Sequence, residues 1–170
     1  MNPKSSYKVF VAIPFDGAML PVYKMILNRL EGEFGGRFCF IYGNNPIKPT
    51  SHLEIDFFKN QNNDLLKQFL DNIKSSDIIV ADLTNNNPNV HVELGIAITL
   101  EKNILRVTGR DLTEIASDIR GYENSKYNNP DELYNIIKKY LKLFLSIKDL
   151  PLSEEAGRFY RVDWSRENKI

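Results

Sequence analysis

The sequence has little cysteine and histidine and no excess of charge of either sign. Among 170 residues there are one cysteine, Cys39, and two histidines. One cysteine excludes a disulfide framework and a cysteine-built zinc site, and two histidines without HxxxH spacing do not predict a metal centre. Lys and Arg together number 22, as do Asp and Glu, so the formal net charge is zero. This balance argues against an electrostatic nucleic-acid binder, which needs a basic excess.

Long hydrophobic runs are missing as well. No stretch approaches the roughly 18 apolar residues that cross a bilayer, and the N-terminal MNPKSSYKVF lacks the apolar region of a signal peptide. We therefore expect a cytoplasmic protein without a membrane partner. The length and the 42% hydrophobic content fit one domain with an adequate core. We expect this domain to span residues 1–150, and residues 151–170 to form a tail that packs on it or on a neighbouring subunit.

The familiar nucleotide and hydrolase motifs are also absent. No GxGxxG follows the first expected strand, and no GxxxxGK[ST] occurs anywhere, so neither a dinucleotide-dependent redox enzyme nor a P-loop protein is indicated. Ser51, Ser75 and Ser76 have no GxSxG context, which leaves a hydrolase nucleophile elbow unsupported.

Apolar periodicity predicts strands that alternate with helices. The expected strands are 7–13, 38–42, 77–82, 103–108 and a short one near 119–122. The expected helices are 19–34, 62–74, 90–100 and 131–147. The two prolines of segment 43–51 indicate a surface loop. This alternation predicts a three-layer α/β fold of the flavodoxin-like type, a parallel sheet with helices on both faces.

The predicted fold places a ligand site before any motif is considered. In such sheets, ligands bind outside the carboxyl ends of the strands, where the strand order reverses. With a flavodoxin-like order this point lies between the first and the third strand. The residues delivered there are segment 13–16 on one side, with Pro14, Phe15 and Asp16, and segment 82–84 on the other.

The stretch DLTNNNPNVHVELG, residues 82–95, is the most informative part of the chain. Pro88 suits the first position of a helix, and Asn87 before it is a good N-cap. The helix start therefore points unpaired N–H groups and a partial positive charge into the predicted crevice. Glu93 follows six residues after Asn87.

Glu93 shares its helix stripe with Asn89, Val90 and Ala97, so it can face the crevice. The helix is apolar on nearly every side, where an unpaired charge is costly. Near the helix start, the carboxylate can stay ionised and act as a nucleophile or as the electrostatic partner of a developing oxocarbenium ion. A solvated helix glutamate is the alternative. His91 faces the opposite way and is expected to pack or to meet solvent.

Two aspartates extend this candidate site. Asp82, at the carboxyl end of the third strand, is placed to reach a ligand, or else it caps the asparagine-rich turn. Asp16 has a similar place after the first strand. Together with Glu93 they would set two or three carboxylates around one crevice. Such clusters raise at least one pKa and are common where glycosidic bonds are cleaved.

The order VFVAIPF (9–15) followed by SDIIVADLTNNNPNVHVELGIAITLEKNILRV (76–107) resembles the nucleoside 2-deoxyribosyltransferase-like family. It equally resembles bacterial TIR-like proteins, which share the flavodoxin-like fold. In both, the catalytic glutamate lies on the helix after the third strand, and Glu93 matches it. The aspartate that the transferases carry six residues earlier is Asn87 here, and a further one aligns with Phe69, although Asp71 is nearby. An asparagine cannot protonate a departing base.

The resemblance therefore implies cleavage or transfer at an N-glycosidic bond. NAD is the first substrate to expect, as a substrate rather than a cofactor, because cationic nicotinamide departs without protonation. Glu93 and Asp82 are the predicted catalytic residues, and no metal is expected. The predicted substrate-binding residues are Ile13, Pro14, Phe15, Asp16, Thr84, Asn87 and Asn89.

The TIR-like resemblance further implies a homo-oligomer in bacterial defence signalling. Two alternatives stay open for the activity. One is a nucleoside or nucleotide 2-deoxyribosyltransferase or N-glycoside hydrolase. The other is a non-catalytic module that binds a nucleotide signal.

Overall fold

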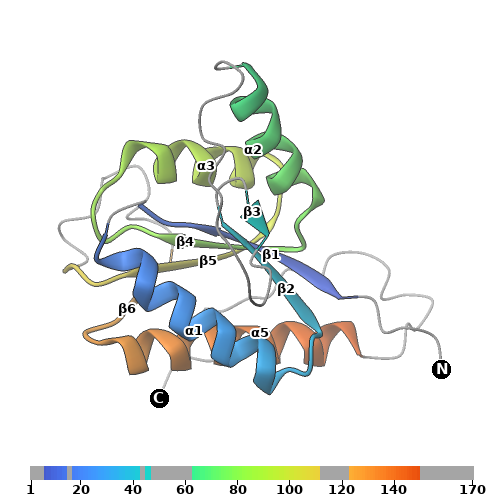
Figure 1. Cartoon of the computed structure of the whole chain (residues 1–170), viewed down its shortest axis with the longest axis vertical. Helices are drawn as coiled ribbons and strands as arrows, with labels where there is room; N and C mark the ends of the chain where they lie inside the picture. Colours follow the sequence, from blue (N-terminus) through green and yellow to red (C-terminus); the bar gives the residue numbers. More distant parts are fainter. Residues whose placement is uncertain (1–5, 15–16, 43–44, 47–62, 112–122, 150–170) are drawn as a thin grey trace.

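The described part of this computed structural model, residues 6–14, 17–42, 45–46, 63–111 and 123–149, forms one twisted sheet between two helical layers (Figure 1). The strands are β1 (Tyr7–Ala12), β2 (Phe38–Tyr42), β3 (Asn45–Pro46), β4 (Ile78–Asp82), β5 (Asn103–Thr108) and β6 (Ser125–Lys126). The helices are α1 (Met19–Glu33), α2 (Asn63–Ser75), α3 (Pro88–Thr99) and α5 (Pro130–Lys148).

The strand order within this sheet is β3-β2-β1-β4-β5-β6. All neighbouring strands pair in parallel except β2 and β3, which pair antiparallel. Helices α1 and α5 cover one face of the sheet, and α2 and α3 cover the other (Figure 1). The three-layer α/β fold of the flavodoxin-like type is therefore confirmed.

Each face of the sheet has its own apolar core. Alternate residues of β1 serve both: Val9 and Val11 pack toward α1 and α5, whereas Phe10 and Ala12 pack toward α2 and α3. All five residues of β4 are buried, as expected for a central parallel strand that is covered on both faces. The carboxyl ends of β1 and β4 are therefore packed between the two apolar cores.

The edges of the sheet differ from the sequence-based expectation. The segment expected to be loop contains the two-residue strand β3, and the last strand is β6 at Ser125–Lys126. The strand expected near 119–122 and the tail 151–170 lie outside the described residues. Among the described helices, none is long and apolar enough to span a bilayer.

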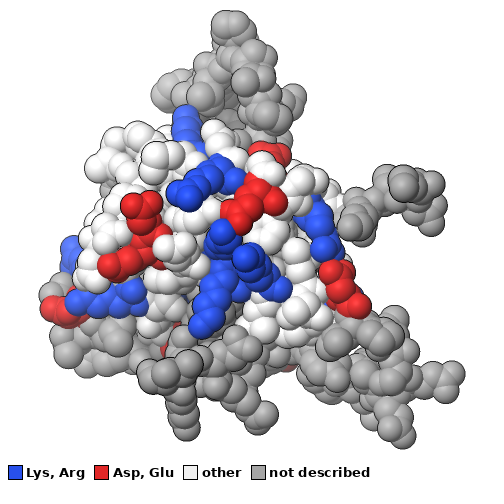
Figure 2. Space-filling view, turned by 90° about the horizontal axis from the view of Figure 1, so that it is seen from below, with Lys and Arg blue, Asp and Glu red and all other residues white. Residues whose placement is uncertain are grey.

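Helix α5 uses its apolar side for packing. Leu141, Phe144 and Leu145 are buried against the sheet. The face of the molecule seen from below carries acidic and basic side chains interspersed (Figure 2). Two of its ion pairs join α1 to α5, Lys138 with Glu33 and Arg29 with Asp131. The lysines of α5 thus belong to a solvated, mixed-charge face.

Candidate functional site

The strand order reverses between β1 and β4. Strand β1 connects through α1 to β2 on one side, and β4 connects through α3 to β5 on the other. Ala12 pairs with Ala81, so the residues that follow both strands emerge at the same edge. Ile13 and Pro14 are buried there, and Thr84 is half-buried. This is the position where doubly wound sheets bind ligands.

Phe15 and Asp16, the other two residues predicted after β1, lie outside the described residues. Their predicted roles in substrate binding therefore stay predictions.

Helix α3 starts at this edge through local capping chemistry. Asn87 has an extended backbone, and its Oδ1 accepts a 2.9 Å hydrogen bond from the Asn89 amide. Pro88 occupies the first helical turn. Asn86 has a φ of 49°, a left-handed conformation that asparagine tolerates better than most residues. The N-cap predicted at Asn87 is thus confirmed, and it places Asn87 half-buried and Asn89 exposed at the rim.

Glu93 is buried on the inner side of α3. Its exposure is 9%, and Val90, Leu94 and Ala97 are the other buried residues of the helix. Within the described residues, no hydrogen bond or ion pair reaches its carboxyl group. Burial raises the pKa of Glu93 to about 7, because desolvation penalises the charged form.

This environment corrects two expectations about Glu93. The alternative of a solvated helix glutamate is wrong, because the side chain is buried. The expectation that the carboxylate stays ionised also needs revision: with a pKa of about 7, neutral and ionised forms are both populated near pH 7.

Asp82 lies at the end of β4 and is fully buried. Its Oδ1 accepts hydrogen bonds from the amide of Thr84 at 2.9 Å and from the Thr84 hydroxyl at 2.5 Å. Its Oδ2 accepts from the hydroxyls of Tyr23 at 2.7 Å and Tyr127 at 2.8 Å. The bond to the Thr84 amide is the turn-capping role that the sequence left open for Asp82. A direct role of Asp82 on substrate stays a prediction.

The two tyrosines are donors in this cluster. Burial, and then the nearby charge of Asp82, raise the pKa of Tyr23 well above its usual range and that of Tyr127 in the same direction. Both phenols therefore keep their protons. Sequence reasoning missed them. Tyr23 sits on the buried stripe of α1, where a phenol needs a hydrogen-bond partner, whereas Tyr127 follows a two-residue strand and carries no local signal.

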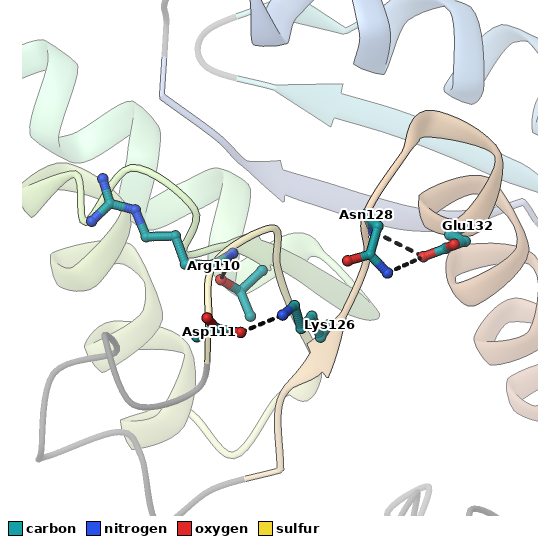
Figure 3. Close-up of polar contacts among 6 residues, drawn as sticks. Arg110, Asp111, Lys126, Asn128 and Glu132 are labelled. Carbon is teal, nitrogen blue, oxygen red and sulfur yellow. Dashed lines mark hydrogen bonds and ion pairs between the residues drawn. The ribbon is translucent and has the colours of Figure 1, made fainter.

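The neighbouring ends of β5 and β6 are joined by polar contacts (Figure 3). Lys126 forms an exposed ion pair with Asp111, which lowers the pKa of that aspartate. Asn128 donates from its amide and its side chain to Glu132 at 2.8 and 2.9 Å. The side chain of Arg110 extends away from the Lys126–Asp111 pair (Figure 3). The ion pair joins β6 to the segment that follows β5, and the Asn128 contacts join the segment after β6 to the first turn of α5.

The fold and the site define an α/β protein with a buried carboxyl group on the helix that starts at the switch point of the sheet. The described residues contain no group of three histidine, cysteine or acidic side chains that could hold a metal ion. That the protein needs no metal stays a prediction.

No protein-family model and no curated protein matches the sequence. Solved structures match it by fold. The CMP N-glycosidase BcmB of Clostridium botulinum superimposes with a TM-score of 0.54 and 22% identity, covering 78% of this chain and 99% of its own. The solution structure of BlsM gives a TM-score of 0.59 and 18% identity, covering 89% of this chain and 99% of its own.

A conserved protein from Enterococcus faecalis V583 gives a TM-score of 0.54 and 13% identity, covering 80% of this chain and 99% of its own. At such identities the likeness shows the fold. The resemblance to the nucleoside 2-deoxyribosyltransferase-like family stays a prediction beyond this fold. The link to TIR-like proteins stays a prediction.

Proposed function

We propose that this protein cleaves, or transfers across, the N-glycosidic bond of a nucleotide, and that Glu93 is its catalytic residue. The observation that carries the proposal is the carboxyl of Glu93, buried and without a polar partner among the described residues, on the helix that begins at the switch point. A buried carboxyl group without a polar partner lowers the stability of the fold when it ionises, and carboxyl groups with strongly raised pKa values are common at functional sites.

The proposed reaction breaks the bond between C1′ of the sugar and the base nitrogen. The bonding electrons leave with the base, and the ionised carboxylate of Glu93 stabilises or captures the cationic sugar. Water or another nucleophile then bonds to C1′ and loses its proton to solvent. The pKa of about 7 leaves a sufficient ionised fraction at neutral pH.

The remaining predicted residues would bind the substrate from the rim. Asn87 would contact sugar hydroxyls with its side-chain nitrogen as donor, since its oxygen caps α3. Thr84 would border the sugar without donating to it, because its hydroxyl already bonds within the protein to Asp82 and Gly109. Asn89 would extend this polar rim. Ile13 and Pro14 would form an apolar wall. Phe15 would stack on the base, and Asp16 would add a polar contact to the substrate.

Two substrates follow from different observations. NAD is favoured because Asn87 stands where the transferases that the sequence resembles carry an aspartate, and nicotinamide leaves as a neutral molecule without being protonated. A cationic ring would also stabilise the ionised form of buried Glu93. A pyrimidine nucleoside monophosphate is the second candidate, because the similar structure from Clostridium botulinum is a CMP N-glycosidase. With this substrate the base leaves as an anion, and it would take its proton from water.

The decisive experiment is product chromatography after incubation with NAD, CMP, UMP and deoxynucleosides, each alone. Wild-type protein should release a base from at least one nucleotide. Glu93→Gln should reduce that release by roughly a hundredfold or more, as loss of a group acting in the transition state does. Val92→Gln is the matched control, because it places the same amide on the exposed side of α3.

Three results would contradict the proposal or part of it. Base release that survives Glu93→Gln would remove Glu93 from the mechanism. Base exchange between deoxynucleosides without hydrolysis of nucleotides would assign a deoxyribosyltransferase. Saturable nucleotide binding without turnover would assign a binding module and overturn the enzymatic proposal.

A further inference from the structure

A hydrogen-bonded cluster of five residues is built around the carboxylate of Asp82 at the site edge. Asp82 accepts from Tyr23 of α1, from Tyr127 after β6 and twice from Thr84 in the turn after β4. The Thr84 hydroxyl oxygen in turn accepts a 2.8 Å hydrogen bond from the amide of Gly109, which follows β5. We call this set of five residues the Asp82 cluster. It links α1 with the ends of β4, β5 and β6.

The cluster uses the full acceptor capacity of Asp82. A carboxylate offers about four lone-pair positions, and four donors occupy them here. The residue has no exposed surface. A substrate hydroxyl could bond to Asp82 only by displacing one of these donors, so the cluster supports an indirect role for this carboxylate.

The cluster holds two loops at the site edge in one arrangement. Asp82 fixes both the amide and the hydroxyl of Thr84, and Leu83 donates its amide to Val107 of β5 at 2.9 Å. Gly109 lies so close that an added Cβ would be 3.3 Å from the Thr84 methyl carbon and 3.4 Å from the Tyr127 ring. The turn that leads into α3 is therefore tied to the turn after β5.

Tyr127 has a second contact that Tyr23 lacks. Its hydroxyl oxygen is 2.9 Å from the Thr84 hydroxyl as well as 2.8 Å from Asp82 Oδ2. Its single proton is donated to Asp82, and the same oxygen lies against the Thr84 hydroxyl. Loss of this hydroxyl loosens Thr84 directly, whereas loss of the Tyr23 hydroxyl removes one bond to Asp82 alone.

We propose that Asp82 and Tyr127 are positioning residues, which set the turn before α3 and thereby the place of Glu93 relative to the strand ends. The catalytic part of this inference rests on the proposed function, and the structural part does not. Small displacements of a reacting group lower rates steeply, by up to about a hundredfold for 1 Å. This turn leads into the N-cap Asn87, six residues before Glu93 on α3, so we expect a shift of the turn to reach the carboxylate through the start of the helix.

The test compares Tyr127→Phe with Tyr23→Phe and with Tyr134→Phe. Tyr134 also donates its hydroxyl to a carboxylate, that of Glu33, but on the α1–α5 face. It is therefore a matched control for the loss of one tyrosine–carboxylate bond. Two quantities are measured on each folded variant: the exchange rates of the Thr84 and Gly109 amide hydrogens by NMR, and kcat and KM for the nucleotide that wild type cleaves.

Tyr127→Phe should speed exchange at Thr84 and Gly109 by roughly tenfold, and should lower kcat by roughly tenfold with KM within about twofold. Tyr23→Phe should have a smaller effect on both, and Tyr134→Phe should have none. Unchanged exchange in Tyr127→Phe would overturn the inference whether or not the protein is an enzyme. Faster exchange with unchanged kcat would limit the cluster to stability and refute positioning of Glu93.

Gly109→Ala provides a second perturbation that removes no hydrogen-bonding group. The added methyl group would lie in tight contact with Thr84 and Tyr127. It should therefore lower kcat, as Tyr127→Phe does. Full activity in this variant together with normal amide exchange at Thr84 would contradict a coupling of the two turns. If wild type releases no base from any nucleotide, the proposed function fails, and amide exchange alone decides the structural part.

Discussion

Replacing Glu93 with glutamine should stabilise the protein at alkaline pH and have no such effect at acidic pH. In the folded state the pKa of Glu93 is raised from 4.5 to about 7 by burial. Between these two values the native state binds more protons than the unfolded state, so stability falls as pH rises. Below about pH 4.5 the group is protonated in both states and contributes no penalty. Above about pH 7 the full penalty is present.

The size of this effect follows from the shift. A difference of about 2.5 pH units corresponds to roughly 3 kcal/mol, at about 1.4 kcal/mol per unit. That is a large part of the 5–15 kcal/mol that typically holds a domain of this kind together. Glutamine has nearly the same shape and never ionises, so the pH-dependent part of the difference between the two proteins isolates the carboxyl group.

Urea unfolding of both proteins between about pH 5 and pH 8.5 measures this difference. The free energy of unfolding of Glu93→Gln relative to wild type should increase by roughly 2–3 kcal/mol across that range. Val92→Gln should differ from wild type by a constant amount, because it removes no ionisable group. A difference for Glu93→Gln that is flat with pH would refute the reasoning and show that the carboxyl is solvated or paired.

Four further outcomes are expected. The kcat/KM for base release should rise with pH through about 7, because only ionised Glu93 stabilises a cationic sugar, and a flat pH–rate profile would exclude that role. Asp82→Asn should lower the free energy of unfolding by roughly 2 kcal/mol in urea titrations, since four donors lose a charged acceptor. Asn87→Ala should lower it by about 1 kcal/mol through loss of the N-cap of α3. Asp111→Asn, which breaks the exposed pair with Lys126, should change Tm by no more than about 2 °C in thermal scans with or without added salt.

Periodicity predicted the central sheet because its four longer strands contain enough apolar residues to give a signal. Strands β1, β2, β4 and β5 have five or six residues each, and all residues of β4 are buried. The edge strands β3 and β6 have two residues each. A two-residue strand has no period, and it exists because a neighbouring strand offers hydrogen-bonding partners. Such pairing is a property of the assembled sheet.

The same distinction applies to the site. The start of α3 was predictable, because Asn87 and Pro88 act on their own neighbours. The partners of Asp82 were not, since Tyr23 and Tyr127 lie 59 and 45 residues away from it in sequence. The pKa of Glu93 was not predictable either. It depends on how completely the folded chain excludes water from one side of the helix.

Asp82 and Glu93 are two buried carboxyl groups near the same strand ends, and burial affects their contributions to stability in opposite directions. The sequence places both beside the switch point, and both are buried. Asp82 is satisfied by four donors, so burial strengthens its hydrogen bonds and the cluster adds to stability. Glu93 meets no donor in the described structure, so burial raises its pKa and lowers stability when it ionises. Because ionised Glu93 lowers stability and has no partner among the described residues, we expect its partner to be a ligand. A cationic sugar would be a suitable partner for the carboxylate.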